Sequence, residues 1–105
     1  MTKVEMTVAY HLPPDAVTAL YDLVEAPTAD AVLGYYERGL HPGACIANIL
    51  CNDLWMAVVN ADRSDATHLA DLTHWIYVYL PHSARGNEER FRNWMEMHSR
   101  SKQND

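Results

Sequence analysis

The segment from Pro42 to Asp62 limits the possible folds of this chain more than any other stretch does. It is the longest predominantly apolar stretch, and its apolar residues recur with the 3.6-residue period of a helix of about five turns. Trp55 and Val59 stand outside the main apolar sector, so the helix is apolar on nearly its whole surface. Such helices are normally buried on several sides. We therefore predict a central helix over about residues 43–61. Its main apolar sector comprises Ile46, Ala47, Leu50, Cys51, Leu54, Ala57, Val58 and Ala61.

Proline, glycine and capping residues divide the remaining chain into further helices. Pro13-Pro14 favours the start of one helix, and Gly39 is placed to end the next in a left-handed conformation. A 3–4 spacing of apolar residues predicts a helix through 69–80, and Asn87 is placed to cap a last one. The fold class that we predict is all-α, a compact bundle of about five helices around the central apolar helix.

The length of 105 residues corresponds to one domain with its own core. We assign residues 1–98 to a single helical domain and the polar residues 99–105 to a flexible tail. Residues 1–12 alternate partly between apolar and polar side chains, which predicts either a short strand or an irregular extended arm.

The net charge of −6 is unevenly distributed. Residues 1–80 carry three basic and ten acidic side chains, whereas residues 81–105 carry five basic and four acidic ones. An acidic body disfavours non-specific binding to a phosphate backbone. The sequence has no apolar run of about 18 residues and no signal-peptide pattern at its start. We therefore expect a cytoplasmic protein that does not associate with membranes.

No residue pattern in this chain indicates catalysis. A Gly-rich phosphate loop and a nucleophile elbow are both absent, so we predict no enzyme activity and no cofactor. His68, Asp71 and His74 are spaced three apart, whereas helical zinc pairs stand at i and i+4, so we predict no metal site there. A small metal-dependent enzyme or a ligand sponge, built on histidines and Asp53, is the alternative.

Three polar residues interrupt the predicted central helix: Asn48, Asn52 and Asp53. A buried carboxylate costs several kcal/mol unless it is paired or hydrogen-bonded. We therefore predict that these residues form a structural polar anchor that binds loop amides or an arginine. The other interpretation is that Asp53 lies exposed on a partner-binding face together with Trp55 and Met56.

Charged residues elsewhere provide two more candidate surfaces. Asp15, Asp22 and Glu25 lie on the outer side of the first helix and form a candidate site for a basic partner. The chain has three Trp and six Tyr against one Phe, a composition that is typical of interfaces and is also used in the cores of small helical domains. The basic C-terminal segment, with its arginines, supports the alternative of a helical nucleic-acid-binding regulator. Those arginines are Arg85, Arg90 and Arg92.

Residues 39–43 and 50–57 together resemble a group of small, largely uncharacterised phage and prophage proteins. The first stretch, Gly-Leu-His-Pro-Gly, fits the pattern GxxPG, and the second, Leu-Cys-Asn-Asp-Leu-Trp-Met-Ala, fits LxNDLxxA. Ala-Asp at 61–62 follows, and the resemblance covers roughly residues 33–96. It implies a phage-encoded accessory protein that acts on host machinery or host defence.

These observations lead to one principal hypothesis. We expect an all-helical accessory protein that binds and inhibits or redirects a host protein, with anti-CRISPR-like inhibition as its most concrete form. The partner is a host protein of unknown identity. We also expect self-association, because many Trp and Tyr residues in a small chain leave aromatic surface for a second copy.

Overall fold

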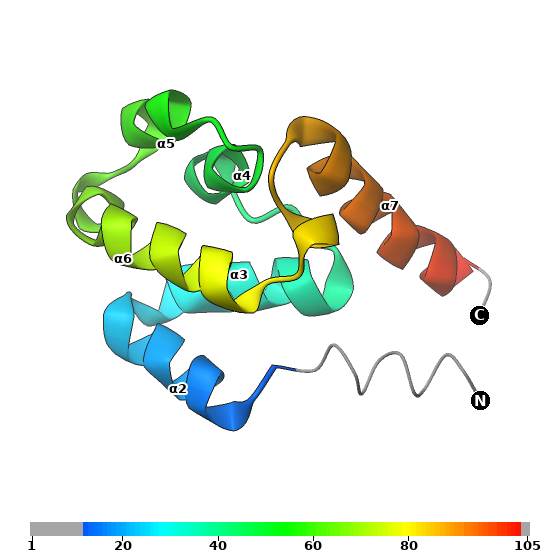
Figure 1. Ribbon diagram of the computed structural model, residues 1–105, viewed down its shortest axis with the longest axis horizontal. Coiled ribbons are helices and arrows are strands. Elements are labelled where there is room, and N and C mark those ends of the chain that lie inside the picture. Colours follow the sequence, from blue (N-terminus) through cyan, green and yellow to red (C-terminus); the bar gives the residue numbers. More distant parts are fainter. Residues whose placement is uncertain (1–11, 104–105) are drawn as a thin grey trace.

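The computed structural model describes the backbone of residues 12–103 and the side chains of residues 12–99. This part of the chain contains helices and loops and no strand, which confirms the all-α fold class (Figure 1). The predicted N-terminal arm lies outside the described residues except for Leu12. The last helix continues to Gln103, past residue 98, where we had placed the end of the domain. The elements in order are α2 (Pro14–Leu23), α3 (Ala26–Arg38), α4 (Ala44–Leu50), α5 (Leu54–Asn60), α6 (Arg63–Tyr79), the 3-10 turn η1 (His82–Ala84) and α7 (Glu88–Gln103).

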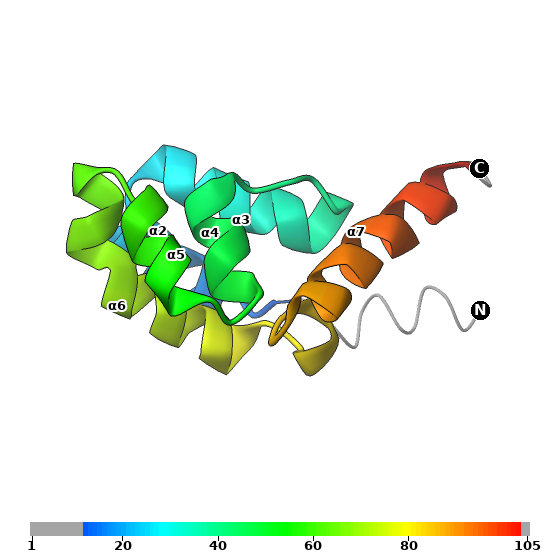
Figure 2. The same cartoon turned by 90° about the horizontal axis from the view of Figure 1, so that it is seen from above.

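Helix α4 is the centre of the bundle. It packs against α5, α6 and α7, and α2 packs against both α3 and α6. Seen from above, α4 and α5 lie between α3 and α6, and α7 extends away from them (Figure 2). All but two of the residues of α4 are buried, so its apolar surface is covered on several sides, as its composition requires. The buried residues of α4 are Cys45, Ile46, Ala47, Ile49 and Leu50.

The prediction of one continuous helix over residues 43–61 is wrong, because the chain breaks between α4 and α5. The N–H of Asp53 donates to the carbonyl of Asn48 at 2.8 Å, and the N–H of Asn52 donates to that of Ile49 at 3.0 Å. These two bonds define a Schellman motif at the end of α4. In this motif the first residue after the helix C-cap adopts a left-handed conformation. Asn52 fills that position with φ of 63°, which asparagine tolerates better than most residues. The apolar repeat therefore covers two short helices.

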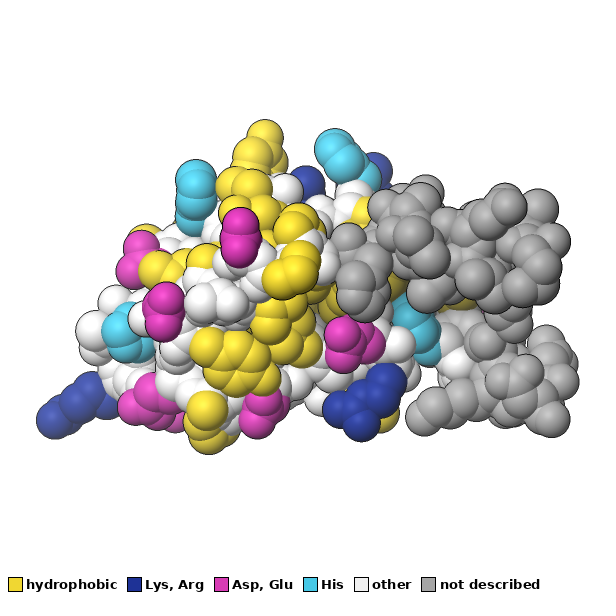
Figure 3. Space-filling model, turned by 90° about the horizontal axis from the view of Figure 1, so that it is seen from below, with side chains coloured by type: hydrophobic (Ala, Val, Ile, Leu, Met, Phe, Trp, Pro, Cys, Tyr) yellow, Lys and Arg dark blue, Asp and Glu magenta, His cyan; other side chains and the backbone are white. Residues whose placement is uncertain are grey.

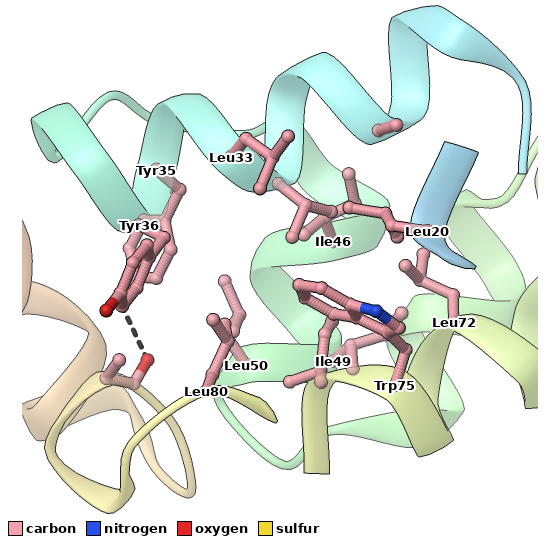
Figure 4. Close-up of a cluster of buried hydrophobic side chains, with 14 of the residues drawn as sticks. Leu20, Leu33, Tyr35, Tyr36, Ile46, Ile49, Leu50, Leu72, Trp75 and Leu80 are labelled. Atoms are coloured by element: carbon pink, nitrogen blue, oxygen red, sulfur yellow. Dashed lines mark hydrogen bonds between the residues drawn. The ribbon is translucent and has the colours of Figure 1, made fainter. Parts of the chain in front are cut away.

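Aromatic residues of the core attach separate helices to one another through their polar atoms (Figure 4). The Tyr35 hydroxyl donates to the Ala84 carbonyl at 2.7 Å, and the Trp75 indole N–H donates to the Ala16 carbonyl at 2.9 Å. The Trp94 indole N–H donates to the Tyr35 carbonyl at 3.1 Å. Within the described residues, every buried side-chain nitrogen or oxygen has a hydrogen-bond partner, so these rings contribute their apolar area without an unsatisfied donor.

Aromatic stacking fixes α7 against the end of α3. The rings of Tyr35 and Phe91 are stacked with centroids 5.3 Å apart, and those of Tyr36 and Trp94 are stacked at 5.7 Å. Helix α7 begins where we predicted, because the Asn87 side chain accepts the N–H of Arg90 at 2.8 Å as an N-cap.

Gly39 ends α3, as predicted, and it also lets α7 approach closely. Its φ of 67° lies in the left-handed region. A Cβ at this position would stand 2.6 Å from the Cβ of His98 on α7. Gly43 also has a positive φ, of 95°, but its ψ of 160° places it outside the left-handed helical region, in a conformation largely confined to glycine. A Cβ at Gly43 would meet no atom within 4 Å. Of these two glycines, only Gly39 is therefore required for the close approach of another helix.

We predict that Gly39→Ala destabilises the fold by more than the cost of a left-handed alanine alone. The left-handed conformation costs about 1–2 kcal/mol, and the added Cβ also forces α7 to move. Chemical denaturation should show a loss of about 2–4 kcal/mol for Gly39→Ala. A loss of no more than about 1 kcal/mol would contradict a close contact between α3 and α7.

Candidate protein-binding surface

Helix α5 leaves large apolar side chains in solvent. The exposed fraction is 80% for Trp55, 62% for Val59, and 54% for both Leu54 and Val58, and Met56 is also exposed. Among the seven residues of α5, only Ala57 is buried. Soluble proteins seldom expose several neighbouring large apolar residues unless these bind something. We call Leu54, Trp55, Met56, Val58 and Val59 the α5 surface.

The α5 surface is held in place at both ends of its helix. The Asp53 carboxylate accepts the N–H of Met56 at 3.2 Å and so caps the first turn. At the other end, the Asn60 side-chain amide donates to the Met56 carbonyl at 3.0 Å. Two residues later, Asp62 accepts the N–H of Asp65 at 2.7 Å and starts α6. The short helix therefore has fixed ends despite its exposed sides.

Of the three predicted polar anchors, Asn48 lies in α4, and Asn52 and Asp53 lie at the break between α4 and α5. Asn48 is half-buried, and its carbonyl accepts the N–H of Asp53. Asn52 and Asp53 are exposed, so Asp53 is not the buried carboxylate that a continuous helix implies. It binds a backbone amide of α5 and lies next to Leu54 and Trp55. Its two predicted roles, anchor and neighbour of a partner-binding face, are compatible.

The predicted acidic partner-binding residues lie elsewhere on the molecule. Asp15 and Asp22 are exposed on α2, and Glu25 precedes α3. Helix α2 is on the side of the molecule opposite α5 (Figure 1). The face that carries α2 shows a band of hydrophobic side chains with Asp and Glu on both sides (Figure 3). The two candidate partner-binding surfaces, Asp15, Asp22 and Glu25 on one side and Asp53, Trp55 and Met56 on the other, therefore lie apart in the structure.

The arginines of the nucleic-acid alternative make contacts within the chain. Arg85 donates from Nε to the Leu80 carbonyl at 3.1 Å and from Nη2 to the Tyr77 carbonyl at 3.0 Å, which caps the C-terminus of α6. Its guanidinium also lies 4.9 Å from the centre of the Tyr77 ring. Arg90 donates to the Arg85 carbonyl at 3.3 Å, and Arg92 pairs with Glu88.

The surface around Arg92 is acidic. An open hollow on α7 is lined by Arg92 and Asn93 together with three glutamates. A phosphate backbone requires a basic footprint, and these glutamates oppose one. The glutamates are Glu88, Glu89 and Glu96. The described part of α7 therefore offers poor support for nucleic-acid binding.

The described residues bring together no group of three His, Cys, Asp or Glu side chains that could hold a metal ion. His68, Asp71 and His74 on α6 are among the described residues, and they do not form such a group. Cys45 and Cys51 are both free thiols. Burial raises the pKa of each thiol, so both are mainly protonated at neutral pH and poorly nucleophilic.

Three members of the α5 surface were not predicted as exposed, because the apolar repeat favoured one continuous helix. Leu54 and Val58 were placed in the buried sector, and Val59 was assigned no role. The dipeptide Asn52-Asp53 is the signal that identifies the break. Asn is a common left-handed helix-ending residue after Gly, and Asp is a strong N-cap, so together they end one helix and start the next.

Comparisons of the chain with protein-family models, with curated proteins and with solved structures found no match. The resemblance to small phage proteins therefore stays a prediction. In the described residues, no helix is both long and apolar enough to span a bilayer.

We predict that Asp53→Ala lowers stability while Asp53→Asn does not. Asparagine caps a helix about as well as aspartate, whereas alanine leaves the Met56 N–H without its acceptor, at a cost of about 1 kcal/mol. For a domain of this size that loss lowers the melting temperature by about 4–8 °C. A thermal melt of both variants tests the cap, and an unchanged melt for Asp53→Ala would refute it.

We also predict that Trp55 dominates the solvent-accessible fluorescence of the protein. Trp75 and Trp94 are only 2% and 8% exposed, so acrylamide should quench them slowly and their emission should lie at shorter wavelength. Trp55→Phe should remove the readily quenched, red-shifted component. If the quenching profile of Trp55→Phe matches that of the unmodified protein, Trp55 is covered in solution.

Proposed function

We propose that this chain is a non-enzymatic binding protein that docks on a partner protein through the α5 surface. The observation that carries the proposal is the exposure of five large apolar side chains on one seven-residue helix. Trp is among the residues that contribute most to binding energy at protein interfaces, and Trp55 projects furthest into solvent. The other apolar side chains of the α5 surface would then exclude water from the contact around Trp55. These side chains are Leu54, Met56, Val58 and Val59.

The resemblance to phage accessory proteins indicates the kind of partner. Under that resemblance the partner is a host protein, and binding inhibits or redirects it. Inhibition of a host defence system, in the manner of anti-CRISPR proteins, is the most concrete form. The acidic body of the chain supports a protein partner over nucleic acid, because acidic surfaces repel phosphate.

The described contacts of the C-terminal arginines weaken the nucleic-acid alternative. Arg85 caps α6, Arg90 binds a backbone carbonyl and Arg92 pairs with Glu88. Releasing these contacts to bind phosphate costs stability at the end of α6 and the start of α7. We therefore retain the protein-binding function alone.

Trp55→Ala tests the proposal. Because the side chain is exposed, we expect stability to stay within about 0.5 kcal/mol of the original, while affinity for the partner falls at least about 30-fold. The partner is taken from bacterial lysate by the unmodified protein, identified, and its affinity then measured with purified components. Loss or redirection of the partner's activity on adding the chain completes the test.

Met97→Ala is the control, because Met97 is a large apolar residue on α7 that is also more than half exposed. It should bind as the unmodified protein does. Equal capture by Trp55→Ala and the unmodified protein would remove the α5 surface as the docking site. If a salt-sensitive nucleic-acid complex were lost on neutralising Arg90 and Arg92, the alternative function would replace this one.

A further inference from the structure

Both ends of the α5 surface carry exposed acidic groups. Asp53 precedes the helix and Asp62 follows it by two residues, and both are exposed. Each carboxylate uses one oxygen, Oδ1, to cap a helix, so its charge stays next to solvent. Arg63 follows Asp62 directly, but it is the one Lys or Arg between Arg38 and Asp71, against three acidic residues, Asp53, Asp62 and Asp65. The α5 surface is therefore an apolar patch bordered by negative charge.

This border argues against a second copy of the chain as the occupant. A two-fold dimer pairs the same surface with itself. If two α5 helices met antiparallel, Asp53 of one copy would approach Asp62 of the other, and if they met parallel, Asp53 would approach Asp53. Both arrangements place like charges together at the edge of an apolar contact, which opposes association. Each copy also has a net charge of −6.

We infer that the occupant of the α5 surface is an apolar surface of another protein bordered by Lys or Arg side chains, with a recess that receives the Trp55 ring. The inference rests on the proposed function and specifies the chemistry of its partner. Apolar contact supplies affinity, and the opposite charges at the border steer the encounter and select against acidic competitors. Rim charges of this kind act mainly on the association rate and on its salt dependence.

The capping role of the two aspartates allows a sharp test. Asparagine caps helices as well as aspartate does, so the double variant Asp53→Asn/Asp62→Asn removes two negative charges and keeps both helix starts. The matched control is Asp15→Asn/Asp22→Asn, which changes the net charge equally on α2, on the opposite side of the molecule. Because both double variants remove two negative charges, a difference in their binding affinity shows that the position of the charges matters and not the net charge alone.

The probe is a synthetic amphipathic peptide of about 18 residues, long enough to form a helix, with leucine on one face and lysine on the other. Its counterpart has glutamate in place of lysine. Calorimetry and the blue shift of Trp55 emission measure binding. We expect the unmodified protein to bind the lysine peptide and not the glutamate peptide. Asp53→Asn/Asp62→Asn should bind the lysine peptide about 3- to 10-fold more weakly at low salt. The control should change less than about 2-fold.

Several outcomes would overturn the inference. Equal binding of the two peptides, or equal weakening in the two double variants, would show that border charge does not select the partner. A concentration-dependent dimer that Trp55→Ala dissociates would make a second copy the occupant. Equal binding to phosphatidylcholine and phosphatidylglycerol vesicles, lost in Trp55→Ala, would make it a lipid surface. If Trp55→Ala loses the protein captured from lysate while both double variants retain it equally, the proposed function stands and this inference fails.

Discussion

The break at Asn52-Asp53 is the constraint on which the rest of the structure depends. In two residues, a Schellman ending closes α4 and a side-chain cap opens α5. Without the break, residues 44–60 would form one rod, and the bundle would have to cover apolar side chains along its whole length. With the break, α4 is buried among α5, α6 and α7, while α5 turns its side chains outward. Asn52 and Asp53 therefore divide the apolar segment into a buried helix of the core, α4, and a helix that carries the candidate site, α5.

The core around α4 depends on polar atoms of aromatic residues as well as on apolar area. Tyr35, Trp75 and Trp94 each donate to a backbone carbonyl of a different segment, and these bonds connect helices far apart in the sequence. A phenylalanine core would lack such specific links. The composition of three Trp and six Tyr against one Phe thus has a structural explanation in part, which does not extend to the exposed residues Trp55, Tyr21, Tyr77 and Tyr79.

The candidate site needs this rigid support because its own helix is short. Helix α5 has seven residues, and an isolated helix of that length does not form in water. Its fixed ends and its packing against α4 keep Trp55 in place before a partner arrives. Preorganisation of this kind reduces the entropy lost on binding, so even a small apolar surface can contribute useful affinity.

Local signals in the sequence determined the fold class, the ends at Gly39 and Asn87, and the helical state of residues 69–80. Each depends on hydrogen bonds or periodicity within a few residues, which a single sequence displays. Only the tertiary structure decided which half of the 43–61 segment is covered. Leu50 and Leu54 occupy equivalent places in the apolar repeat, yet Leu50 is fully buried and Leu54 is 54% exposed. Burial depends on whether other helices lie against a side chain, and the periodicity of one segment does not contain that information.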